Sequence, residues 1–321
     1  MRIRAILVAF LVGAGTILTA TPAHAEPLVG FTEWSPPENL GPVLNTAAEE
    51  SAPALSDDGL SLYFNRNPNL LGDNDEDLYV STRSRRGPWG DPAPLDTINT
   101  PTSNERNATL SRDGLLLFFS SDRPGGVGGL DLYVSRRNDR TDNQGWSTPV
   151  NLGPSVNSPQ ADVGPAYVED EAGSTVLYFT SNRPGGLGAA DIYRSRLGAD
   201  GSFGPPVLVP ELSSRSGDAR PAIRADGLEL VLHSNRPGPP SCAPDSPSPS
   251  GLQDLWVSTR SAVTDPWTCP VNLGPVLNSS SNDLQAALSD DAEELFFSSN
   301  RTIGGFGSDD LWMSKREPRR A

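Results

Sequence analysis

The sequence predicts an all-β protein, a five-bladed β-propeller with four antiparallel strands in each blade. First, one stretch recurs five times at a spacing of about 50–60 residues, a period typical of propellers and solenoids. Second, each copy holds four short apolar or aromatic segments bounded by Gly, Pro, Asn or Asp, without helical periodicity. Third, the chain opens on an unmatched strand and closes on an incomplete repeat, so its two ends can complete one blade.

The recurring stretch contains the end of one strand, a Gly-rich loop, and then Asp followed by an apolar-aromatic strand. Its copies are Ser120–Arg136, Thr180–Arg196 and Ser298–Arg316, with looser copies at His233–Arg260 and Asn65–Arg83. Gly-rich loops can cradle phosphate, but these loops join strand to strand and no helix N-terminus follows to receive an anion. We interpret the stretch as the corner between the second and third strands of a blade.

The other strands of each copy have their own signatures. The innermost strand opens with an acid and runs into an Asp-Gly turn, whose Gly accepts the positive φ of a tight hairpin. Its clearest copies are Glu50–Gly59, Glu105–Gly114 and Asp218–Gly227. The outermost strand is aromatic and ends in Asn-Leu-Gly-Pro. Its clearest copies are Trp34–Pro42, Trp146–Pro154 and Trp267–Pro275.

The two ends of the chain predict how the ring closes. Residues 34–40 form an aromatic strand before any complete repeat, and the last repeat ends with the strand at 310–316. We expect these two strands to pair in the last blade, because this pairing removes an open sheet edge. The predicted propeller domain is 34–316, after a short segment at 26–33 and before a tail at 317–321.

The first 25 residues have the pattern of a secretory signal peptide. Arg2 and Arg4 form a basic start, residues 6–18 are apolar, and Ala23-His24-Ala25 is an A-x-A cleavage pattern. The apolar run is too short to span a bilayer and no second run follows, so no membrane insertion is expected. We expect a secreted protein, either extracellular or periplasmic.

Acidic side chains dominate the chain. Removing residues 1–25 takes two Arg and no acids from 25 basic and 40 acidic side chains, which leaves a formal charge of −17. Such a surface repels nucleic acid and anionic membranes, so neither is an expected partner. A solvated acidic surface is a simpler explanation than a cation or a basic partner, and we expect a monomer.

The only two cysteines, Cys242 and Cys269, both lie in the fourth copy. An exported protein can oxidise them, so we predict a single local disulfide. This disulfide would pin an unusually long loop to its own blade.

Three polar positions recur around the predicted ring. The aspartates before the Leu/Ile-aromatic pairs are Asp77, Asp131, Asp191, Asp254 and Asp310. The acids that open the inner strands are Glu50, Glu105, Asp162, Asp218 and Asp283. The arginines of the Gly-rich loops are Arg123, Arg183, Arg236 and Arg301, whereas Arg66 stands two positions early in the first copy. One interpretation is a binding ring at the channel mouth for a cation or a basic peptide terminus. The other is that each Arg pairs with an acid of its own or the next blade, which repetition in every blade favours.

Copies that depart from the pattern are the better candidates for function. Residues 67–76 replace the Gly-rich loop of the first copy, and Asp73, Asp75 and Asp77 alternate there as in part of a calcium loop. An ordinary acidic turn is the alternative, and no other cofactor is expected. The fourth copy carries a Pro/Ser-rich insertion at 237–253, either a lid over the channel or a surface loop.

The motifs PALSDDG, SNRPGG and DLY together resemble the TolB-type, WD40-like β-propeller repeat of exported bacterial proteins. The resemblance covers nearly all of residues 34–316. It implies a scaffold that binds a protein, a peptide or another ligand and that has no catalytic set.

Catalysis has one alternative worth keeping. His233, the only His after the signal peptide, aligns with Ser120, Thr180 and Ser298, so no Ser-His-Asp triad is expected, and too few Cys and His remain for a zinc site. A glycoside hydrolase could place two carboxylates in a central funnel, but they must differ in environment and the inner-strand acids are equivalent by repeat. We therefore expect an exported non-enzymatic scaffold, with a carbohydrate-active hydrolase or lectin-like protein as the alternative.

Overall fold

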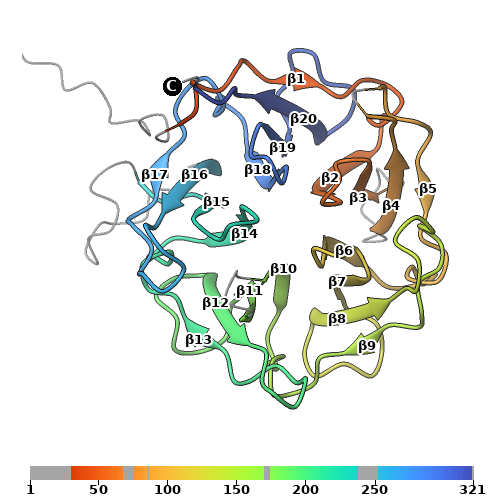
Figure 1. Ribbon diagram of the computed structural model, residues 1–321, viewed down its shortest axis with the longest axis vertical. Helices are drawn as coiled ribbons and strands as arrows, with labels where there is room; N and C mark the ends of the chain where they lie inside the picture. Colours follow the sequence, from red (N-terminus) through yellow and green to blue (C-terminus); the bar gives the residue numbers. More distant parts are fainter. Residues whose placement is uncertain (1–29, 68–75, 86, 170–173, 238–251, 320–321) are drawn as a thin grey trace, which may run out of the picture.

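The computed structural model describes residues 30–67, 76–85, 87–169, 174–237 and 252–319. Over these residues the chain forms five four-stranded antiparallel sheets around a central axis, as Figure 1 shows. The prediction of an all-β, five-bladed propeller is confirmed. Within the same residues, no helix is long and apolar enough to cross a membrane.

Four blades follow the chain order, each from an inner to an outer strand. Blade 1 comprises β2 (Glu49–Leu55), β3 (Ser61–Asn67), β4 (Asp77–Thr82) and β5 (Ala93–Pro94). Blade 2 comprises β6 (Glu105–Leu110), β7 (Leu116–Ser121), β8 (Asp131–Arg136) and β9 (Val150–Asn151). Blade 3 comprises β10 (Asp162–Glu169), β11 (Thr175–Ser181), β12 (Asp191–Arg196) and β13 (Val207–Leu208). Blade 4 comprises β14 (Asp218–Ile223), β15 (Glu229–Ser234), β16 (Asp254–Thr259) and β17 (Val271–Asn272).

Blade 5 joins the two ends of the chain. It comprises β18 (Asp283–Leu288), β19 (Glu294–Ser299), β20 (Asp310–Lys315) and the N-terminal β1 (Glu38–Asn39). Glu38 pairs with Met313 and Asn39 with Trp312, and the Leu40 amide donates to the Leu311 carbonyl at 3.0 Å. The predicted closure by strands 34–40 and 310–316 is confirmed, although the regular ladder spans fewer residues of the N-terminal segment.

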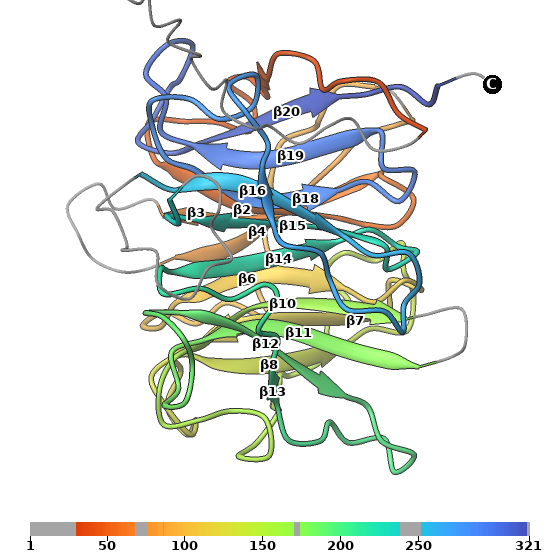
Figure 2. The ribbon, with the colours of Figure 1, turned by 90° about the vertical axis from the view of Figure 1, so that its left-hand side faces the viewer.

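The strands extend between two faces of the disc, which Figure 2 shows edge-on. Inner strands begin on the loop face, which carries the Gly-rich loops 122–130, 182–190 and 300–309. They end on the hairpin face, which carries the Asp-Gly turns that follow β2, β6 and β14. Gly59 and Gly114 adopt φ values of 68° and 71° there, as the hairpin prediction requires.

Apolar side chains fill the space between neighbouring blades. Five hydrophobic clusters occupy the five blade interfaces. At the interface of blades 5 and 1, Leu62 and Phe64 pack with Phe296 and Leu311, all of them fully buried. Each such side chain contributes about 2–3 kcal/mol through burial, so ring closure completes one of five equivalent cores.

A β-bulge interrupts every inner strand at the same place, and it shapes the channel. The bulged residues have positive φ and are Ala52, Asn107, Gly164, Arg220 and Gln285. We call them the bulge positions. Each bulge amide donates to a side chain on the second strand of the preceding blade, so no bulge N–H is left unpaired. These acceptors are Ser298, Asn65, Ser120, Thr180 and His233, respectively.

Candidate functional site

The five inner-strand acids are held in buried ion pairs. Each carboxylate is fully buried, binds an arginine of its own blade, and accepts a hydrogen bond from a Ser or Thr four or five residues earlier. The ion pairs are Glu50–Arg66, Glu105–Arg123, Asp162–Arg183, Asp218–Arg236 and Asp283–Arg301. These contacts agree with the interpretation that acid and arginine hold the blade together.

The same arginines connect neighbouring blades. Arg123 donates to the Ile98 carbonyl at 2.7 Å and lies over the Phe119 and Tyr133 rings at 5.2 and 5.0 Å. In the first blade Arg66 donates to the Leu44 carbonyl at 3.0 Å, although it stands two positions early in the sequence. The first blade therefore keeps this interaction, which corrects the expectation that it breaks the pattern.

The aspartates before the third strands hold the Gly-rich loops. Asp131 accepts hydrogen bonds from the Val127 and Gly128 amides and from the Asn151 side chain. Asp191 and Asp310 accept the corresponding loop amides in blades 3 and 5. The Gly-rich stretch that recurs in the sequence is thus a corner between the second and third strands, and its aspartate holds the loop.

Several sequence-based predictions lie outside the described residues. Asp73 and Asp75 of the calcium prediction fall there, whereas Asp77 begins β4. Cys242 and most of the insertion at 237–253 also fall there, so the disulfide with Cys269 stays a prediction. Among the described residues, no group of three or more His, Cys, Asp or Glu side chains is placed to hold a metal ion.

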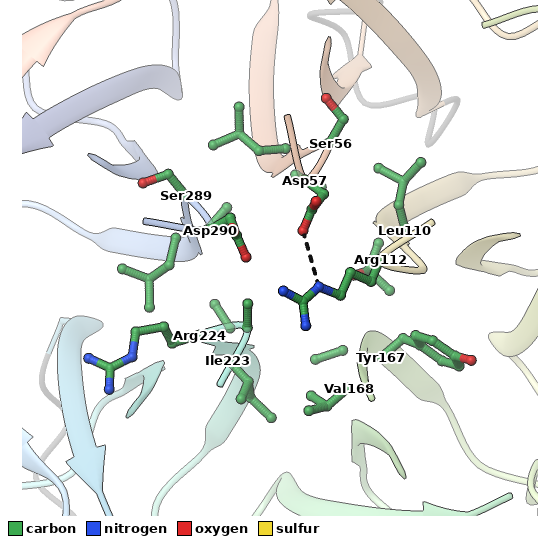
Figure 3. Close-up of a pocket in the computed structure, with 18 of the residues that line it drawn as sticks. Ser56, Asp57, Leu110, Arg112, Tyr167, Val168, Ile223, Arg224, Ser289 and Asp290 are labelled. Carbon is green, nitrogen blue, oxygen red and sulfur yellow. Dashed lines mark ion pairs between the residues drawn. The ribbon is translucent and has the colours of Figure 1, made fainter. Parts of the chain in front are cut away.

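The central channel narrows to a collar of small and apolar residues. Its cavity of about 140 Å³ is lined by Pro and Ala of the inner strands, by Arg220, and by charged residues of the hairpin face such as Asp57, Arg112 and Asp290. On the hairpin face Arg112 points toward the axis and pairs with Asp57 at 3.8 Å, with Asp290 beside them (Figure 3). Arg112 is 56% exposed, so this ion pair is a solvent-screened surface contact.

Blade-specific acids occur at the opposite mouth, on the loop face. The carbonyl of the residue before each third strand accepts a hydrogen bond from the amide of the next inner-strand acid, which places all five residues beside the starts of the inner strands. We call these the rim positions; they are Glu76, Leu130, Ala190, Gln253 and Asp309. Glu49, which directly precedes Glu50 on β2, adds a third carboxylate to those of Glu76 and Asp309.

The three carboxylates occupy different electrostatic environments. Burial, followed by the negative charges of Glu76 and Asp309, raises the pKa of Glu49 to about 7. Burial, followed by the charges of Asp310 and Glu76, raises the pKa of Asp309 to about 6. Glu76 instead forms an ion pair with Arg106 at 3.1 Å and accepts a hydrogen bond from Asn65. One mouth therefore combines acids that favour protonation with a carboxylate in an ion pair.

Three of the described residues at the rim and bulge positions carry a buried polar atom without a hydrogen-bond partner. These atoms are Nη1 of Arg220, Oδ1 of Asp309 and Oε1 of Gln253. Such atoms are uncommon in folded proteins and require an explanation, of which a ligand site is one.

Sequence reasoning missed these residues, although the sequence carries a signal for them. The rim position reads Glu, Leu, Ala, Gln and Asp through the five copies, and the residue before each inner-strand acid is Glu only in the first. The acids that differ between copies stand directly beside acids that repeat, which concealed them.

His233 has the structural role that its alignment with Ser and Thr suggested. Its Nδ1 accepts the Gln285 amide at 3.2 Å, so the neutral ring carries its proton on Nε2. Burial, followed by the charge of Arg220, lowers the pKa of His233 to about 3. A neutral acceptor buried in this way stabilises a bulge, as the hydroxyls do in other blades.

Crowding of acids at the loop-face mouth predicts a stability gain from Glu49→Gln. Glu49 is charged in both states above pH 7 and neutral in both below pH 4.5, so the native state is penalised only at the higher pH. Glu49 is only half-buried, so screening limits the gain to about 1 kcal/mol, or about 2–4 °C in the unfolding midpoint. Calorimetry at pH 8 and pH 4 should show the gain at pH 8 alone. The exposed control Glu317→Gln should change neither midpoint, and an equal shift at both values would contradict the charge explanation.

Comparisons with known proteins place the fold. No family model and no curated protein matches the sequence. The structure is similar to a thermostable family-43 glycoside hydrolase, with a TM-score of 0.59 and 11% identity over 87% of this chain and 92% of that one. It is also similar to an α-L-arabinofuranosidase from Lactobacillus brevis, with a TM-score of 0.57 and 13% identity over 86% and 92% of the two chains. Identity this low shows the propeller fold alone.

The comparisons correct the function expected from the sequence. TolB from Acinetobacter baumannii is similar with a TM-score of 0.46 and 15% identity, over 86% of this chain and 56% of TolB. The sheet topology confirms the five-bladed propeller, whereas the TolB-type family is not specifically supported. The expected non-enzymatic scaffold is contradicted by the family-43 glycoside hydrolase and the arabinofuranosidase named above, which share the fold over most of both chains. The carbohydrate-active alternative agrees better with them.

Proposed function

We propose that this protein is an exported glycoside hydrolase whose active site is the loop-face mouth of the channel. The observation that carries the proposal is the group of Glu49, Glu76 and Asp309, three blade-specific carboxylates in different environments. Glycoside hydrolysis needs such a difference, because one carboxyl group must donate a proton while the other acts as base or nucleophile. The glycoside hydrolases that share the fold support the same reaction class.

Glu49 is suited to the role of general acid. With a pKa of about 7, much of it is protonated at neutral pH and can give its proton to the glycosidic oxygen as the bond to the leaving group breaks. Its pKa is high because burial disfavours the charged form and because the charges of Glu76 and Asp309 oppose its ionisation.

Glu76 is suited to the complementary role. Its ion pair with Arg106 and its hydrogen bond from Asn65 orient a carboxylate that can deprotonate water or attack the anomeric carbon. Asp309 contributes its charge and the buried Oδ1, which can accept a hydrogen bond from a sugar hydroxyl. The signal-peptide pattern at 1–25 supports export to a compartment where polymeric glycans occur.

A hydrolysis screen of the mature chain tests this function. Residues 26–321 are incubated with arabino- and xylo-oligosaccharides and with a panel of 4-nitrophenyl glycosides, and released sugar is measured. Glu49→Gln and Glu76→Gln should each lower kcat/KM by about 10²–10⁴, as expected for loss of a proton-transfer group. The alkaline limb of the wild-type profile should fall with an apparent pKa near 7, because Glu49 loses its proton.

Asp57→Asn is the matched control, because Asp57 is a channel carboxylate on the hairpin face. It should retain wild-type turnover. Saturable glycan binding without turnover would replace the hydrolase with a lectin-like protein. Turnover that survives both glutamate substitutions would remove the proposed site.

A further inference from the structure

We infer that Arg220 binds an anionic group of the sugar, so the site takes an acidic saccharide that carries a carboxylate or a sulfate ester. The inference names a substrate class for the proposed hydrolase and in that respect rests on the proposed function. Its basis is a buried guanidinium at the channel mouth that lacks a counter-ion among the described residues.

Arg220 is buried but not paired. Only 7% of the residue is exposed, and its Nη1 has no hydrogen-bond partner within the described chain. Neither an ion pair nor a side-chain hydrogen bond joins its guanidinium to a described carboxylate, although Glu76 lies near enough for its charge to act on it. Burial lowers the pKa of Arg220 to about 9, which shows how poorly this environment compensates the charge.

Two other buried arginines, Arg236 and Arg316, have the partners that Arg220 lacks among the described residues. Arg236, in the same blade, is 4% exposed and binds both Asp218 and the Leu212 carbonyl. Arg316 is also 4% exposed and binds Glu229 at 2.7 Å and the Ala292 carbonyl. Burial of a guanidinium without such partners is costly, so retention of one that does not hold the fold points to a ligand.

The neighbouring blade leaves space for this side chain. A Cβ added at Gly164, the bulge position of blade 3, would lie 2.5 Å from Cδ of Arg220 and 3.3 Å from its Cγ. The two bulges have similar positive φ values, 62° at Gly164 and 54° at Arg220. Blade 4 therefore presents an arginine at this position, and blade 3 presents a glycine along which the arginine lies. The side chain of Arg220 is thus held against Gly164, and it also lines the cavity of the channel.

The charge and the planar donors of the Arg220 guanidinium favour an anion over a hydroxyl as its ligand. A guanidinium presents a planar set of donors that bind carboxylate or sulfate oxygens in pairs. The carboxylates of Glu49, Glu76 and Asp309 belong to other blades of the same mouth and are available for the glycosidic bond. A hexuronate or a sulfated hexose could therefore place its charge on Arg220 and its anomeric carbon near the acids.

Equilibrium binding measured by calorimetry tests the inference without requiring turnover. The wild-type mature protein is titrated with D-galacturonate, D-galactose 6-sulfate and neutral D-galactose at fixed ionic strength. At least one anionic sugar should bind about tenfold or more tightly than D-galactose, and the stronger of the two identifies carboxylate or sulfate as the group. Equal affinity for all three sugars, or no binding of either anionic sugar, would overturn the inference.

Two variants separate binding from folding. Arg220→Met should remove the preference for the anionic sugar and leave the thermal unfolding midpoint unchanged or higher, because it removes a buried unpaired charge. A midpoint that falls while the preference persists would assign Arg220 to the fold and overturn the inference. Gly164→Ala should weaken anionic-sugar binding through displacement of Arg220. Its control Gly153→Ala carries the same kind of strain, with φ of 76°, but meets no atom within 4 Å and should bind as wild type does.

The outcomes also separate this inference from the proposed hydrolase. Arg220-dependent binding of an anionic sugar without hydrolysis of any glycoside would reject the hydrolase and keep the anion site. Hydrolysis of neutral oligosaccharides that Arg220→Met leaves unchanged would keep the hydrolase and reject the anion site.

Discussion

Deletion of residues 26–41 is expected to abolish the single cooperative unfolding transition. The deletion removes β1, so blade 5 loses its outer strand and β20 becomes an open sheet edge. It also removes Trp34, which stacks on the Arg316 guanidinium at 4.4 Å and packs against the core of blades 4 and 5. Urea unfolding followed by tryptophan fluorescence and by far-UV circular dichroism should give broad, non-coincident curves instead of one transition.

A peptide of residues 30–41 supplied in trans provides the control for this deletion. Because the contacts of β1 are local to blade 5, the peptide should restore a sharp transition in a concentration-dependent way. A truncated protein that melts in one sharp transition without the peptide would show that the ring does not depend on this closure.

Arg236→Leu is expected to cost about 3–5 kcal/mol of unfolding free energy. Arg236 and Asp218 form the most buried of the five repeated ion pairs, with side chains that are 1% and 0% exposed. Removal of the arginine leaves a buried carboxylate whose Ser214 and Ser234 donors cannot neutralise its charge. The Leu212 carbonyl also loses its donor, which loosens the connection between blades 3 and 4. Chemical denaturation at pH 7 measures the difference.

Two further variants show whether burial decides the cost. Arg140→Met breaks the Arg140–Asp58 pair, whose side chains are 57% and 37% exposed, and should cost less than about 1 kcal/mol. Asp218→Asn combined with Arg236→Leu should recover part of the loss, because no buried charge is then unpaired. A loss in Arg236→Leu as small as that in Arg140→Met would contradict a structural role for the repeated pair.

The fold could be read from the sequence because each blade repeats the same local rules. Asp-Gly turns, short apolar strands and an unmatched strand at each end determine the number of blades and the way the ring closes. The structural role of the repeated arginines could be predicted because they recur in each blade. Arg66, although two positions early in the sequence, forms the same kind of ion pair with Glu50.

The site could not be read in the same way, because it depends on differences between blades. The high pKa of Glu49 arises from burial and then from the charges of Glu76 in its own blade and Asp309 in blade 5, which are far apart in sequence. Likewise, Arg220 has room for its side chain because Gly164, in another blade, carries none. Comparison of equivalent positions across copies would have singled out these residues, but not their proximity.

At each bulge on the inner strands, the backbone amide binds the preceding blade and the side chain varies between blades. The backbone amide at each bulge position is bound by the preceding blade whatever side chain the residue carries. Ala52, Asn107, Gly164, Arg220 and Gln285 show how widely it varies. Ligand preference could thus be redesigned at these five positions, singly or together, in a ring whose bulge amides keep their hydrogen bonds. A small combinatorial library at the bulges would yield folded propellers with different channel chemistry.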